Sequence, residues 1–120
     1  MRGGELLDKT ALDRLVAILG DDPADLADLL ETFQEEGPML VATMEQAAGR
    51  QDCDTLRRTA HSLKSSARDV GAKVLADTCA AIEAMLRAGE APDGVLIERV
   101  CTEWTVIDAA LRTEIRRLKG

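Results

Sequence analysis

Apolar residues recur at intervals of three and four along almost the whole chain, and this spacing predicts α-helices rather than β-strands. The aromatic residues are only Phe33 and Trp104, and the chain has no Tyr. A core must therefore be built from Leu, Ala, Val, Ile and Met, which is typical of helical bundles. A chain of 120 residues is long enough to bury one such core, so the sequence predicts a single all-α domain.

Capping and breaking signals divide this pattern into five segments. Asp21-Asp22-Pro23 is a strong helix start, because an Asp cap is followed by Pro in the first turn. Gly37-Pro38 interrupts the second segment, but the apolar spacing resumes in phase, which favours one kinked helix over two helices. The helices are expected at about residues 8–19, 22–48, 52–70, 72–88 and 95–118.

The connections between these segments are short, so neighbouring helices are expected to run antiparallel. We predict an antiparallel up-and-down four-helix bundle in which a short N-terminal helix caps one end. The bundle forms one domain over residues 8–120, and residues 1–7 form a flexible N-terminus. A bundle with one buried core is expected to be a monomer.

The charge of the chain limits the kinds of partner that it binds. Its formal net charge of −7 argues against nucleic acid and against an anionic membrane surface. No apolar stretch has the length of a signal peptide or a membrane span, so we expect a cytoplasmic protein. Three widely spaced cysteines fit neither a disulfide framework nor a zinc site, and we expect reduced thiols and no metal at Cys53, Cys79 and Cys101.

The only histidine, His61, is the main candidate for chemistry. In a helix it lies on the side opposite an apolar stripe, so its imidazole is expected to face water. The same side carries three cations, and two small serines let a partner surface approach and donate hydrogen bonds to a phosphate. These five residues are Arg57, Lys64, Arg68, Ser65 and Ser66. An exposed imidazole beside cations, on an acidic chain, indicates a place where an anion binds and leaves.

Other interpretations of His61 are weaker. A single exposed histidine is often an ordinary surface residue, and basic residues on a helix are often a solvated face. Metal binding is not supported, because the chain has no second histidine and no Cys or carboxylate at ligand spacing from His61. The combination of one outward histidine, three cations and small neighbours favours the anion site.

The run Ala60-His61-Ser62-Leu63-Lys64-Ser65-Ser66-Ala67, followed by Gly71-Ala72, resembles the signature of histidine-containing phosphotransfer (HPt) domains. That signature is His-x-Leu-Lys-Gly-Ser-(Ser/Ala) and then Gly-Ala, so Ser65 replaces the usual Gly. The similarity to free-standing bacterial members covers roughly residues 8–118. Further matching features are Asp22-Pro23, Phe33 before Gly37-Pro38, Leu75 to Cys79, Ile82-Glu83 and Arg87-Ala88-Gly89.

The resemblance implies a phosphocarrier of a two-component phosphorelay rather than an enzyme. His61 would accept a phosphoryl group from a receiver-domain aspartate and pass it to another receiver domain, and Lys64 would stabilise its charge. The expected partners are receiver domains of response regulators and of a hybrid histidine kinase, with no cofactor. We expect docking on Arg57, Arg58, Ser65, Ser66 and Arg68, flanked by apolar residues near Phe33 to Pro38.

Two alternatives stay open at this point. A histidine-kinase phosphoacceptor domain usually has an acidic residue after its histidine and a proline a few residues later, but here Ser62 follows His61 and the next proline after His61 is Pro92. The chain also has no Gly-rich nucleotide-binding segment. The second alternative is a helical interaction module that binds receiver domains or other partners without relaying phosphate, and the presence of both His61 and Lys64 argues against it.

Overall fold

The computed structural model describes residues 6–92 and 94–120, and all regular structure in these residues is α-helical. The helical expectation and the five-segment division are therefore confirmed, with boundaries within a few residues. The predicted flexible N-terminus falls partly on residues 1–5, which lie outside the described residues. The helices are α1 (Lys9–Ile18), α2 (Pro23–Gly49), α3 (Cys53–Asp69), α4 (Lys73–Arg87) and α5 (Gly94–Lys119).

Aspartate side chains begin the first three helices. Asp8 accepts a hydrogen bond from the Thr10 backbone N–H at 2.9 Å, and Asp22 accepts one from Ala24 N–H at the same distance. Asp52 caps α3 by accepting from the Thr55 backbone N–H at 3.2 Å. Each carboxylate satisfies an N–H that has no partner inside its helix, so these positions fix where the helices start.

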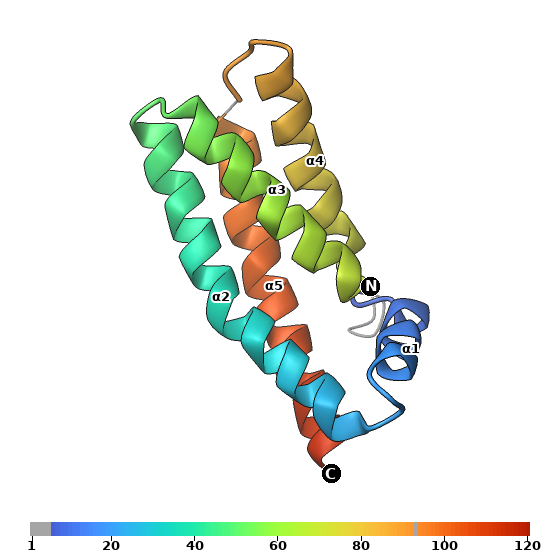
Figure 1. Cartoon of the computed structure of the whole chain (residues 1–120). Helices are drawn as coiled ribbons and strands as arrows, with labels where there is room; N and C mark the ends of the chain where they lie inside the picture. The colour runs from blue at the N-terminus through green and yellow to red at the C-terminus, as the bar shows by residue number, and fades with distance from the viewer. Residues whose placement is uncertain (1–5, 93) are drawn as a thin grey trace.

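The second helix is continuous over 27 residues, although Pro38 lies inside it. Its ribbon bends near the middle in Figure 1, as expected for one kinked helix, and the alternative of two separate helices is wrong. Gly37 faces α5, where a Cβ atom would lie 2.1 Å from Cη2 of Trp104. Phe33, one turn earlier, meets the same indole edge-on, with ring centroids 5.1 Å apart. The glycine is therefore required by the close approach of the Trp104 ring.

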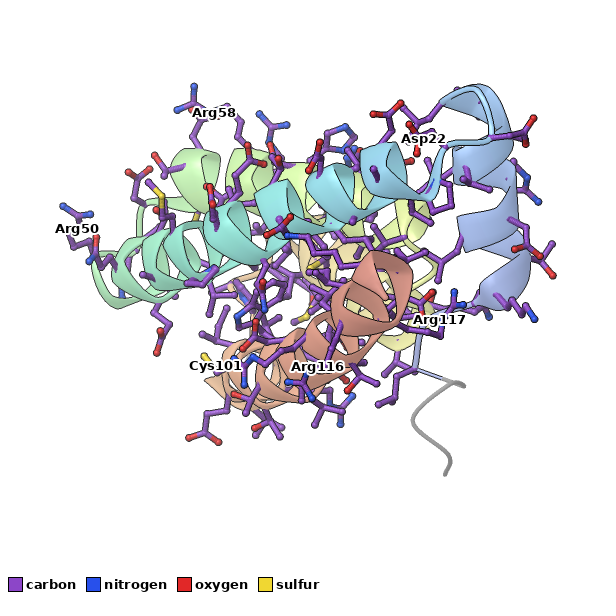
Figure 2. All side chains as sticks on the ribbon, turned by 90° about the horizontal axis from the view of Figure 1, so that it is seen from below. Asp22, Arg50, Arg58, Cys101, Arg116 and Arg117 are labelled. Carbon is purple, nitrogen blue, oxygen red and sulfur yellow. The ribbon has the colours of Figure 1, made fainter. Side chains whose placement is uncertain are left out.

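The four longer helices surround one core. Helix α2 packs against α3 and α5, and α4 packs against the same two helices. The colours of Figure 1 show the chain direction alternating from α2 to α5. Carbon-rich side chains fill the space between the ribbons in Figure 2, whereas Arg50 and Arg58 point outwards. The core is almost entirely aliphatic, and its largest fully buried apolar members include Leu30, Met44, Leu56, Leu63, Leu75, Ile82 and Leu111.

Helix α1 lies across one end of the molecule, where it contacts α2 and α3. The link to α3 is made at Gly71, whose φ of +76° is a left-handed conformation that favours glycine. Its carbonyl accepts a hydrogen bond of 3.0 Å from the Asp8 backbone N–H, and a Cβ there would lie 2.5 Å from that nitrogen. Leu7 is buried in the core just before this contact. The end of the histidine-bearing helix therefore holds the start of α1.

All three cysteines are free: Cys53 is exposed, Cys101 is half-buried and Cys79 is buried. Burial raises the pKa of the Cys79 thiol to about 12, so this residue acts as a small apolar side chain. No helix within residues 6–92 and 94–120 combines the length and the hydropathy needed to cross a membrane.

Candidate functional site

His61 lies in the middle of α3, and its side chain is 57% exposed, so the predicted exposure is confirmed. The imidazole turns towards α4 rather than towards α2. There Nδ1 lies 3.1 Å from Oε2 of Glu83. The contact joins an exposed ring on one helix to a carboxylate on the next, and it fixes one side of the ring.

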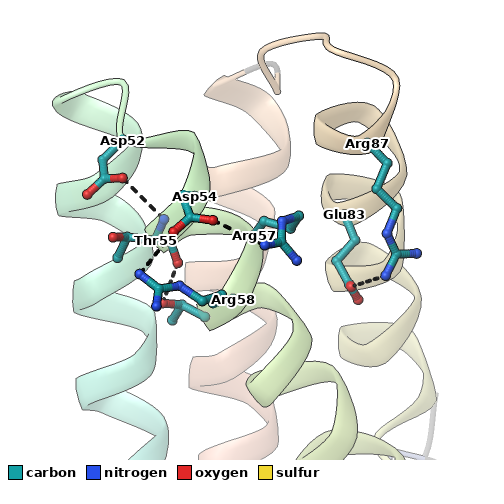
Figure 3. Close-up of polar contacts among 8 residues, drawn as sticks. Asp52, Asp54, Thr55, Arg57, Arg58, Glu83 and Arg87 are labelled. Carbon is teal, nitrogen blue, oxygen red and sulfur yellow. Dashed lines mark hydrogen bonds and ion pairs between the residues drawn. The ribbon is translucent and has the colours of Figure 1, made fainter.

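Glu83 is the centre of the site, although its own side chain is only 1% exposed. Its Oε1 lies 2.5 Å from Nζ of Lys64, and its Oε2 lies 3.1 Å from both His61 Nδ1 and a guanidinium nitrogen of Arg87. Figure 3 shows the side chain of Arg87 reaching Glu83 along α4. The carboxylate thus has donors from two helices, which a buried charge requires.

The protonation of Glu83 follows from these contacts. Burial raises the pKa of the Glu83 carboxyl, but hydrogen bonds from Lys64 and His61 lower it more, and its pKa lies below the ordinary value. Glu83 is therefore ionised near neutral pH and can only accept hydrogen bonds. We assign the ring proton to Nδ1 of His61 for this reason, which leaves the lone pair of the neutral ring on Nε2.

Lys64 is not exposed, contrary to the expectation from the sequence. Its side chain is only 12% exposed, and its ammonium group points inwards to Glu83. The helix geometry explains the difference, because Lys64 comes four residues after the buried Ala60 and lies at the edge of the buried stripe. The buried carboxylate of Glu83 on α4 faces the ammonium group there.

The predicted basic face is divided by Asp54. Arg57 and Arg58 each form an ion pair of 3.1 Å with the carboxylate of Asp54, and Figure 3 shows both guanidinium groups beside it. Arg68 and Ser65 are exposed, as expected. Ser66 is half-buried and lies about 140° around α3 from His61. Ser66 is therefore on another side of the helix, away from the imidazole.

The apolar flank expected near Phe33 to Pro38 is also not present as predicted. Phe33 and Gly37 are buried because they face Trp104 on α5. The exposed residues of this stretch are Glu35, Glu36 and Pro38, so Pro38 is its only exposed apolar side chain, followed by the exposed Met39. The apolar pattern of α2 serves the core here rather than a docking face.

The sequence interpretation did not give a role to Glu83 or Arg87. A usable signal was present, because Glu83 follows Cys79 by four residues and therefore shares its inward face. A lone acidic residue on a predicted core face needs cationic partners, and Lys64 was the candidate with the right helical position. Arg87 follows one turn later on the same helix as Glu83. Only the distance between α3 and α4 shows that these residues meet.

The comparisons with known proteins identify the family of this chain. A family model described as Hpt domain matches residues 28–120. Among solved structures, histidine-containing phosphotransfer protein B (HptB) from Pseudomonas aeruginosa PAO1 is similar, with a TM-score of 0.84 and 29% sequence identity over 93% of this chain and 96% of that chain. The comparison with curated proteins found no match. The resemblance seen in the sequence is confirmed, and the chain belongs to the Hpt domain family of histidine phosphotransfer proteins of phosphorelays.

Proposed function

We propose that His61 accepts a phosphoryl group on Nε2 from the aspartyl phosphate of a receiver domain and passes it to an aspartate of another receiver domain. The observation that carries the proposal is the contact of 3.1 Å between Nδ1 and the ionised Glu83. It orients an exposed ring and keeps the proton on the nitrogen that does not react. His61 is also the only histidine of the chain.

The transfer step needs no proton donor or acceptor from this chain. The lone pair of Nε2 attacks phosphorus, the bond from phosphorus to the aspartate oxygen breaks, and the electron pair leaves with the carboxylate. Nδ1 keeps its proton, so the ring gains a positive charge when the new bond forms. Glu83 is already ionised on the far side of the ring and stabilises that charge. Transfer to the second aspartate reverses these changes and restores the neutral ring.

The partners and the architecture are part of the same proposal. The receiver domain supplies Mg²⁺ and the reacting aspartate, so this chain acts as a phosphocarrier and not as an enzyme. Its carrier unit is an antiparallel up-and-down four-helix bundle, α2 to α5, with α1 as a cap, and it works as a monomer. The packing of α2 and α4 between α3 and α5 supports this description. The similar HptB is named as a histidine-containing phosphotransfer protein, which supports the assigned role.

The experiment is transfer of labelled phosphate from several phosphorylated receiver domains to the wild-type chain and to His61→Gln. We expect the wild type to take up a label that is labile in acid and stable in alkali, and His61→Gln to take up none. Circular dichroism checks that both proteins are folded. A folded wild type that takes no label from any receiver would contradict the proposal and favour an interaction module. Label on His61→Gln would contradict the proposal by showing that another residue accepts the phosphoryl group.

A further inference from the structure

Glu83 binds two cations that differ in their freedom to move. Lys64 is 12% exposed and lies on Oε1, whereas Arg87 is 62% exposed and lies on Oε2. Oε2 also receives Nδ1 of His61 at the same distance of 3.1 Å. Arg87 and the imidazole are therefore neighbours across one oxygen atom.

The two cations also differ in what their departure would leave behind. If Lys64 moved, Oε1 would remain buried without a cationic partner, which is unfavourable for a carboxylate. If Arg87 moved, Oε2 would keep its hydrogen bond from His61, and Oε1 would keep Lys64. Arg87 can therefore leave Glu83 while both carboxylate oxygens keep a partner, whereas Lys64 cannot.

A phosphoryl group on Nε2 would add negative oxygens to the ring that shares Oε2 of Glu83 with this long, exposed arginine side chain. A guanidinium presents several N–H donors in one plane and binds phosphate oxygens in pairs, whereas an ammonium acts as a point charge. We propose that Arg87 leaves Glu83 to bind the phosphoryl group on His61, while Lys64 stays on Glu83 and holds the carboxylate in place. This inference rests on the proposed function, and it moves the phosphoryl-binding role from Lys64 to Arg87.

The direct test uses phosphoramidate, a small donor that phosphorylates histidine without a receiver domain. The side-chain Nε–H resonance of Arg87 is followed by NMR before and after the reaction, with His61→Gln as the unphosphorylated control. We expect a shift of the Arg87 resonance in the wild type only, and no comparable shift for Arg58, which is exposed but paired with Asp54. An Arg87 resonance that does not respond to phosphorylation of His61 overturns the inference.

The second measurement is the equilibrium between phosphorylated chain and phosphorylated receiver domain. Arg87→Ala should lower the share of phosphoryl groups on His61 by about tenfold, since a charge-assisted hydrogen bond is lost. Arg87→Lys should have a smaller effect, and the matched control Arg112→Ala, which removes an equally exposed arginine paired with Asp108 on α5, should have none. An unchanged equilibrium in folded Arg87→Ala overturns the inference.

The two proposals fail in different ways. If phosphoramidate labels His61 and shifts Arg87 but no receiver domain transfers phosphate, the relay function is wrong and the contact stands. If receiver domains transfer phosphate and Arg87 does not respond, the contact alone is wrong.

Discussion

The α2–α5 interface around Trp104, here called the apolar seam, differs in chemistry from the α3–α4 interface around Glu83, here called the polar seam. Between α2 and α5, Trp104 packs edge-on against Phe33 and directly over Gly37. Between α3 and α4, a buried carboxylate holds the ammonium of Lys64 and the ring of His61. Apolar burial stabilises a fold directly, whereas a buried ion pair must first offset the cost of removing its charges from water. The apolar seam is therefore expected to contribute more to the stability of the fold, and the polar seam to orient the ring of His61.

Trp104→Ala tests the apolar seam and should give the largest change in stability. The substitution removes the ring from Phe33 and leaves a cavity beside Gly37, so the free energy of unfolding should fall by about 3–5 kcal/mol. Urea unfolding followed by circular dichroism measures this change. Phosphate uptake at His61 should remain wherever the variant is folded. A folded variant that takes up no phosphate would show that the two seams are not separable.

Gly37→Ala tests the same seam by adding one methyl group. The new Cβ would lie within 2.5 Å of three Trp104 ring atoms, so the ring or the helix must move, at a cost of about 1–3 kcal/mol. Gly49→Ala is the matched control, because a Cβ there has no neighbour within 4 Å. Its stability should stay within about 1 kcal/mol of the wild type. Equal effects of the two substitutions in urea unfolding would contradict the assigned role of Trp104.

Lys64→Met tests the polar seam while keeping most of the side-chain length. The lost ammonium leaves Oε1 of Glu83 buried without its cation, so the free energy of unfolding should fall by about 1–3 kcal/mol. Lys73→Met is the control, since its ion pair with Asp77 is exposed and should contribute little. The substitution should also lower phosphate uptake, because Glu83 no longer holds the ring as firmly. A Lys64→Met variant as stable as Lys73→Met would mean that Lys64 is not the partner of Glu83.

The pH dependence of stability tests whether Glu83 is ionised in the folded chain. The pKa of Glu83 is lower in the folded chain than its ordinary value of 4.5, so the unfolded state binds a proton first as the pH falls. The stabilisation from Glu83 is therefore complete above about pH 4.5 and is lost as the pH falls through the lower folded pKa. Urea unfolding of the wild type and Glu83→Gln over this range measures the effect. Their difference in stability should shrink towards acid pH, and a constant difference would contradict an ionised Glu83.

The sequence was sufficient for the parts of this molecule that depend on one helix at a time. Helix positions followed from apolar spacing and from caps such as Asp22, and the exposure of His61 followed from its place opposite the apolar stripe. Family membership followed from the run around His61 and Lys64, since its residues are consecutive. These predictions need no knowledge of how far apart two helices lie.

The predictions that were wrong all depend on which residue lies opposite on a neighbouring helix. Lys64 was expected in water because helical position alone does not reveal a carboxylate on α4. Phe33 and Gly37 were expected beside the docking face, but the facing residue Trp104 draws them into the core. Asp54 weakens the basic face through contacts that are local and could have been read from spacings of three and four. Partners within one helix are thus recoverable from sequence, whereas partners across helices need the structure.

Asp54→Asn tests whether the surface beside the polar seam, rather than the seam itself, meets the receiver domain. The ion pairs of Asp54 with Arg57 and Arg58 are exposed, so the free energy of unfolding should change by no more than about 1 kcal/mol. Freed of that carboxylate, the two arginines present more positive charge to an acidic receiver surface, and phosphotransfer at low salt should become a few-fold faster. The gain should disappear at high salt, because screening removes the attraction between exposed charges. Asp77→Asn makes the same change of net charge on α4 beside Lys73, away from the arginines. If both variants accelerate transfer equally, only net charge matters; if Asp54→Asn alone does, the receiver docks over Arg57 and Arg58.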